Sequence, residues 1–152
     1  MKYLLTAQAL RILSTNKSTR KLYRSVGNVK NAIAGSKETI KKKYIVTAKQ
    51  LTDVVDAYDI ARPGMDVMEI GTGWVHWDSI VLRNKFDCNV LLYDVWDNRS
   101  FNKFINYCSQ LADPEIRARV GFEGAINSDL MARLIKCESL EAAYDLLGFD
   151  YL

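Results

Sequence analysis

Two short motifs contain residues whose types and spacing suit the binding of a nucleotide-like ligand. In the first motif an apolar run reaches an acid, Glu69, and breaks at Gly71 and Gly73. In the second motif an apolar run ends in Asp94, about 20 residues after Gly73. Because glycine has no Cβ, its backbone can approach a ligand closely and adopt positive φ angles. An acid that follows the next strand can accept hydrogen bonds from both hydroxyls of a ribose. The two motifs therefore predict a nucleotide-binding crevice.

The segments around these motifs are predicted to form two parallel strands joined by a helix. Residues 65–70 are almost continuously apolar, which is typical of a buried strand with helices on both faces of its sheet. A turn at 71–73 leads to a helix that begins near Trp74, and this helix aims free N–H groups into the crevice, where an anion binds well. Residues 88–95 form the second strand. This strand–helix–strand order implies a right-handed crossover and a parallel pair.

These motifs, with Pro63-Gly64 before them, resemble the first two motifs of the class I, Rossmann-like S-adenosylmethionine-dependent methyltransferases. The resemblance is strong over roughly residues 60–111. It implies that Glu69 and the glycine turn surround the methionine part of the cofactor and that Asp94 binds the adenosine ribose. The expected cofactor-binding residues are Glu69, Gly71, Thr72, Gly73, Trp74, Asp94 and Val95.

The glycine spacing separates this reading from a dinucleotide-binding one. NAD-linked enzymes commonly carry Gly-x-Gly-x-x-Gly, whose third glycine would fall at position 76, and this chain has His76 there. The spacing favours S-adenosylmethionine over NAD. The methyltransferase pattern also commonly continues with a third glycine directly after position 74, where this chain has Val75. We assign no catalytic residue and no metal ligand.

Other polar or aromatic residues near the motifs are interpreted as structural. His76 is the only histidine, and we expect it to be a hydrogen-bonded wall residue and not a catalytic base. Trp77 is expected in the core. Asp97 or Asn98 is expected to cap the helix that follows the second strand.

The N-terminal part is expected to form a helical cap over residues 1–60. Apolar spacing indicates a short helix over 2–13 and a weaker helical pattern over 16–35. A longer helix should begin after Ser36, which can cap it, and run to about Ile60.

Residues 61–152 are expected to form an incomplete Rossmann-like cofactor-binding domain. Asp113-Pro114 starts a short segment, Ser128 and Ser139 are candidate caps of two further helices, Gly148 ends the last helix, and residues 149–152 begin a third strand. The predicted fold class is α/β, a partial doubly wound parallel sheet of two to three strands with an N-terminal helical cap.

The resemblance also implies which parts of the site this chain contains. In the resembled family the strand order is 3-2-1-4-5-7-6, and the adenine pocket and most contacts to the methyl acceptor follow the second strand unit. We therefore expect roughly the first half of a methyltransferase, with an unidentified acceptor. The strand at 65–70 would lie at an open edge of the sheet, which favours a homo-oligomer or another sheet-completing partner.

Charge is distributed unevenly along the chain. Residues 1–49 contain twelve of the 21 Lys and Arg but one of the 18 acids, a net charge of +11, and the remainder has −8, which together give the overall +3. This asymmetry supports an alternative function, a non-catalytic binding or regulatory module whose basic arm binds nucleic acid or an anionic surface. A basic arm can equally lie against the acidic body of its own chain.

Cysteine usage and hydropathy indicate the compartment. The cysteines are three, scattered, and have no Cys-x-x-Cys spacing, which suits a reducing compartment. The sequence has no apolar run of membrane-spanning length, and its first residues lack a cleavage site for secretion. We expect a cytoplasmic protein without a membrane span.

Overall fold

The computed structural model describes residues 39–95, 97–121 and 128–152 of the chain, and these form a mixed α/β fold. Its sheet contains three parallel strands in the order β1-β2-β3. They are β1 (Asp66–Ile70), β2 (Asn89–Tyr93) and β3 (Phe149–Tyr151). The mixed α/β class and the third strand at 149–151 were both expected. The helices expected over 2–13 and 16–35 lie outside the described residues.

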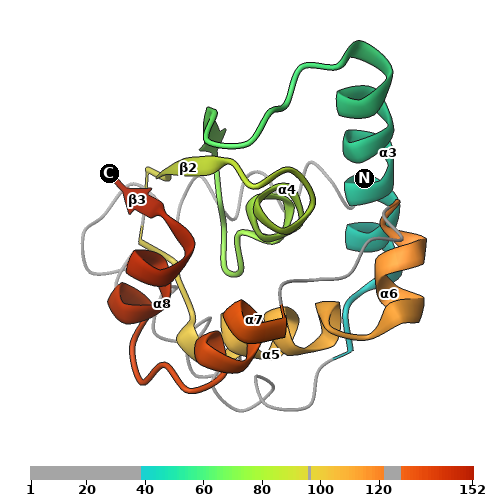
Figure 1. The fold of residues 1–152 in the computed structure, drawn as a ribbon. Helices are drawn as coiled ribbons and strands as arrows, with labels where there is room; N and C mark the ends of the chain where they lie inside the picture. Colours follow the sequence, from blue (N-terminus) through green and yellow to red (C-terminus); the bar gives the residue numbers. More distant parts are fainter. Residues whose placement is uncertain (1–38, 96, 122–127) are drawn as a thin grey trace, which may run out of the picture.

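The described helices lie on one side of the sheet, as Figure 1 shows. They are α3 (Lys42–Tyr58), α4 (Trp77–Phe86), α5 (Phe101–Leu111), α6 (Pro114–Arg119), α7 (Ser128–Leu134) and α8 (Leu140–Leu147). In this view α3 stands at the right, α4 lies to the right of β2, and α8 lies below β3 and leads directly into it.

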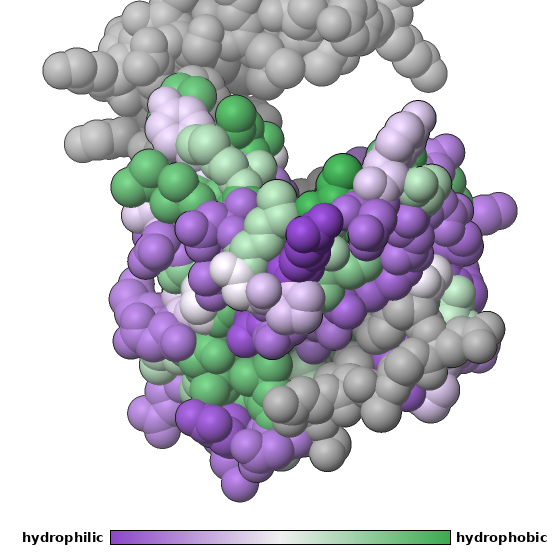
Figure 2. Space-filling view, turned by 45° about the horizontal axis from the view of Figure 1, so that its top comes forward, coloured by the Kyte–Doolittle hydropathy of each residue, from purple (hydrophilic) through white to green (hydrophobic). Residues whose placement is uncertain are grey.

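The sheet buries one face, so the expectation that helices cover both faces of residues 65–70 is wrong for the described part of the chain. Exposure alternates along β1, and Met68 and Ile70 are 51% and 73% exposed. In β2 the inward residues Val90 and Leu92 are buried. The apolar run reflects a second face that the described helices do not cover. Figure 2, which turns the top of Figure 1 forward, shows hydrophobic residues among hydrophilic ones on the side nearest the viewer.

Aromatic rings fill the core between the sheet and the helices. Phe104 and Tyr107 from α5 are almost completely buried. Phe104 packs edge-on against Tyr144 of α8 and Phe149 of β3, with ring centroids 5.7 Å and 6.5 Å away. Trp77 is buried, as expected, and its Nε1–H donates to the Tyr44 carbonyl oxygen at 3.0 Å. These contacts join α3, α4, α5 and α8 into one core.

Helix α3 begins later than the sequence indicates. We expected a helix to begin after Ser36, a residue that lies outside the described ones. Residues 39–41 are not helical, so this prediction is wrong for them. Ile40 is buried instead, and its N–H donates to Gln110 Oε1 of α5 at 3.0 Å. Its backbone therefore serves a tertiary contact and not the helical ladder. The helix ends at Tyr58 because Asp59 adopts a left-handed conformation with φ 49°.

The expected cap of α5 is also wrong. Asp97 does not cap the helix, because its Oδ1 accepts hydrogen bonds from the backbone and the guanidinium of Arg99. Ser100 holds the N-cap position without a side-chain bond.

Two local signals in α8 are confirmed. The side chain of Ser139 accepts a hydrogen bond from Ala142 N at 3.1 Å, and Gly148 ends the helix with φ 69°. Among the described residues, no helix has both the length and the apolar composition needed to cross a bilayer.

The Ser139 cap gives a first prediction on stability. Replacing Ser139 by alanine leaves the Ala142 N–H without its acceptor, and we expect a loss of about 1 kcal/mol in the free energy of unfolding. The thermal midpoint should fall by roughly 2–4 °C, measured by circular dichroism. Ser139→Asp supplies another capping oxygen and is the matched control. An equal loss in both variants would contradict the capping role.

Candidate functional site

The glycine turn and Asp94 meet at the carboxyl ends of the parallel strands. Gly71 N donates to the Tyr93 carbonyl oxygen at 2.8 Å. Gly73 N donates to Asp94 Oδ2 at 2.9 Å. Ligands of open parallel sheets bind at this end of the strands. The structure therefore brings together the two motifs that the sequence singles out.

Glycine is required in this turn by backbone conformation and not by crowding. The φ angles are 78° at Gly71 and 63° at Gly73, in the left-handed region that other residues avoid. A Cβ built at either position would meet no atom within 4 Å. The space beside the turn is open to a ligand.

The other expected cofactor residues take different positions. Thr72 is buried at 6% exposure, and its Oγ1 has no hydrogen-bond partner among the described residues. Trp74 is half-buried against the core, and its carbonyl oxygen accepts a hydrogen bond from Ser100 N at 3.2 Å. Val95 projects into solvent, 75% exposed. Thr72 and Trp74 thus belong to the turn, whereas the structure gives Val95 no contact with it.

Helix α4 begins at Trp77, three residues later than expected. Residues 73–75 form a turn, and His76 holds the N-cap position with φ 45°. The free N–H groups of the helix are therefore set back from the glycine turn.

Glu69 joins the end of β1 to the first turn of α4. Its Oε2 accepts hydrogen bonds from the backbone N–H and the hydroxyl of Ser79, the former at 3.1 Å. The Ser79 N–H is among the first amides of α4, which have no acceptor within the helix, so Glu69 caps the helix from the strand. Burial raises the pKa of Glu69 from 4.5 to about 7, and the nearby carboxylate of Asp78 adds to this effect.

His76 is a buried structural residue in this structure. Its side chain is fully buried, and Nε2 shares a hydrogen bond with the hydroxyl of Tyr144. The ring also packs near Phe104, with centroids 5.9 Å apart. Burial lowers its pKa from 6.5 to about 4, so the imidazole is neutral at physiological pH.

Arg99 is a charged residue near the site that the sequence did not point to. Its guanidinium lies 3.8 Å from the ring centroid of Tyr151 in β3 and pairs with Asp97. This stacking ties the segment after β2 to the end of β3. The sequence carries no local signal for it, because the contact depends on the register of β3.

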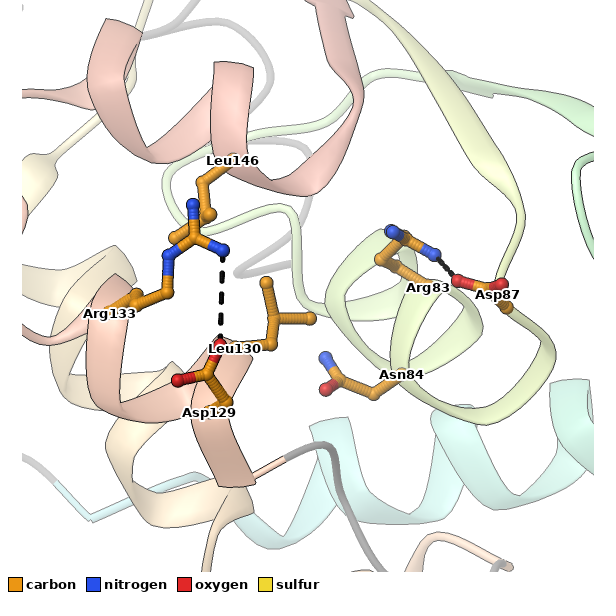
Figure 3. A pocket seen from close by; sticks show the side chains of 7 residues that line it. All are labelled: Arg83, Asn84, Asp87, Asp129, Leu130, Arg133 and Leu146. Atoms are coloured by element: carbon orange, nitrogen blue, oxygen red, sulfur yellow. Dashed lines mark hydrogen bonds and ion pairs between the residues drawn. The ribbon is translucent and has the colours of Figure 1, made fainter.

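A polar cavity of about 430 Å³ lies between α4, α7 and α8, away from the glycine turn. Figure 3 shows that each of its two arginines has an acid within reach. Arg83 pairs with Asp87, and Arg133 lies 3.9 Å from Asp129. Because each cation has a partner, the cavity offers no uncompensated charge to an anion. Among the described residues, no group of three His, Cys, Asp or Glu could hold a metal ion.

Comparison of the chain with protein-family models, with curated proteins and with solved structures finds no match.

Glu69 and His76 shift the pH dependence of stability in opposite directions. Because the pKa of Glu69 is raised, its contribution to the free energy of unfolding is complete below its ordinary pKa of 4.5 and lost as the pH rises through about 7. Because the pKa of His76 is lowered, its contribution is complete above its ordinary pKa of 6.5 and lost as the pH falls through about 4.

Single substitutions should separate the two effects. We compare the free energy of unfolding of Glu69→Gln with that of the unchanged protein at each pH. This difference should rise in favour of the variant by about 3 kcal/mol from about pH 4.5 to 7.5, since each pKa unit is worth about 1.4 kcal/mol. For His76→Asn the same difference in the free energy of unfolding should fall by about as much over this pH range. Urea unfolding at several pH values measures both. Glu115→Gln, at an exposed position on α6, is the matched control. A flat difference for Glu69→Gln would show that this carboxyl is not held protonated by the fold.

Proposed function

We propose that the chain is part of an S-adenosylmethionine-dependent methyltransferase and binds the cofactor at the glycine turn. The observation that supports this most directly is the hydrogen bond from Gly73 N to Asp94 Oδ2. It sets a carboxylate beside an open, glycine-containing turn at the carboxyl ends of two parallel strands. In this proposal Asp94 accepts hydrogen bonds from the ribose hydroxyls, and the methionine part lies along the turn from Gly71 to Gly73.

The sheet order is compatible with the finer fold assignment. The sheet has parallel strands in the order β1-β2-β3. One half of a Rossmann-like doubly wound sheet would have this order, and β1 would then lie next to the switch point. In the resembled family the fourth strand lies beside the first, so the crevice would lie above β1. The proposal therefore places the ligand where the two described loops already converge.

Methyl transfer makes modest demands on the protein. The sulfonium of the cofactor is already activated toward nucleophiles, so the protein mainly aligns the donor and the acceptor and excludes water. In this proposal Asp94 and the glycine turn hold only the ribose and methionine ends of the cofactor. None of the described residues is assigned to the acceptor.

Calorimetric titration with S-adenosylmethionine and its demethylated product tests the proposal. We expect binding that Asp94→Ala weakens at least about a hundredfold, because charge-assisted hydrogen bonds contribute about 1.5–3 kcal/mol each. Asp94→Asn keeps an oxygen that can accept from Gly73 N but loses the charge. A large loss in this variant assigns the effect to the ligand and not to the turn.

Asp150→Asn is the matched control for this titration. Asp150 is exposed on β3, which pairs with β2 and not with β1. Its replacement should leave cofactor binding unchanged. NAD is the comparison ligand and should not bind. The proposal would be contradicted if neither S-adenosylmethionine nor its demethylated product bound. It would also be contradicted if the Asp94 variants bound them as tightly as the unchanged protein does.

A further inference from the structure

A second cavity of about 390 Å³ opens at the edge of β1, between α3 and α4. Residues from both faces of β1 line it, Val67 and Glu69 from one face and Met68 from the other. A cavity bounded by both faces of a strand lies at the edge of that strand. In the described part of the chain, β1 pairs with β2 alone, so this edge is open.

The walls of the cavity are apolar except at one place. Leu51 and Val55 of α3, with Leu82 of α4, supply the helical side. The polar lining consists of Glu69, Asp78 and Ser79. Among the described residues that line the cavity, none is basic, so a negative charge on either acid has no opposite charge inside the cavity.

The acceptor atoms of these two acids are unequally satisfied. Glu69 Oε2 accepts from Ser79, as described above. Asp78 Oδ1 is buried and has no hydrogen-bond partner among the described residues. A buried acceptor without a donor costs about 1–3 kcal/mol, so a donor that reaches it stabilises the folded protein.

We propose that this cavity binds a small primary amine with an apolar body, whose ammonium group lies between Glu69 and Asp78. An ammonium group has three N–H donors and can serve both carboxylates at once. The apolar walls match an alkyl chain, and the volume lies in the range of small-molecule sites. An anion is excluded by the two acids, and a neutral alcohol offers one donor without charge. The proposal does not rest on S-adenosylmethionine binding, because the amine has no nucleoside part.

The probe is n-hexylamine, compared with 1-hexanol and hexanoate in ligand-observed NMR titrations. The three probes share an alkyl chain and differ in the head group. At about pH 8 hexylammonium should bind at least about tenfold more tightly than 1-hexanol, since a charge-assisted hydrogen bond exceeds a neutral one by about that factor. Hexanoate should not bind. Equal affinity for the amine and the alcohol, or binding of neither, would overturn the proposal.

Affinity for the amine should also depend on pH in a stated direction. The cation binds the ionised carboxylate, and the pKa of Glu69 is about 7, so affinity should fall at least about tenfold between about pH 8 and pH 5.5. The titratable groups that act on Glu69 are Asp78 and Asp94, both acids, and the lining residues of α3 carry no charge. Binding of 1-hexanol should not change over this range.

Two substitutions test the acids separately. Glu69→Gln should remove most of the preference for the amine over the alcohol and weaken the pH dependence, of which Asp78, whose pKa burial also raises, keeps a part. Asp78→Asn, which keeps the shape of the side chain, should reduce the preference independently, so the proposal stays testable if one variant folds poorly. The control Glu115→Gln should behave as the unchanged protein. An undiminished preference for the amine in both cavity variants would overturn the proposal.

Discussion

The parallel pairing of β1 with β2 is the constraint on which the candidate site depends. In a parallel pair both strands end at the same edge of the sheet, so the turn after β1 and the segment after β2 must be neighbours. The hydrogen bond between Gly73 and Asp94 follows from this pairing. A slip of one residue in the register would turn Glu69 away from α4 and bring Met68 or Ile70 into the core. The site is therefore as well defined as the β1–β2 register.

Burial of ionisable groups accounts for the chemistry on either side of this pair. Glu69 is half-buried and His76 is fully buried, and this burial favours the neutral form of each side chain. The buried side chain of His76 is stabilised by its hydrogen bond with Tyr144 and by packing against Phe104, as expected of a structural residue. The carboxyl of Glu69 is stabilised by the hydrogen bond that it accepts from the backbone N–H of Ser79 in the first turn of α4. The acid at the end of β1 thus has a structural role that is independent of any ligand.

The sequence predicted the features that depend on local chemistry. Gly71, Gly73 and Gly148 take the positive φ angles that only glycine adopts easily, and Ser139 caps its helix. The proximity of the glycine turn and Asp94 was predicted from the parallel order of the two strands that precede them. Features that depend on tertiary partners were missed. Ile40 leaves the helical ladder for Gln110, and the stacking of Arg99 on Tyr151 needs the register of β3.

The exposed face of the sheet shows why apolar content alone misled the strand assignment. Continuous apolar residues predict burial on both faces, yet Ile70 is 73% exposed while Glu69, beside it in sequence, faces the helices. Above its pKa of about 7, Glu69 carries a charge at the β1 edge that no described residue lining the cavity balances. A cationic ligand compensates such a charge, so the ionised carboxylate favours an amine at this edge.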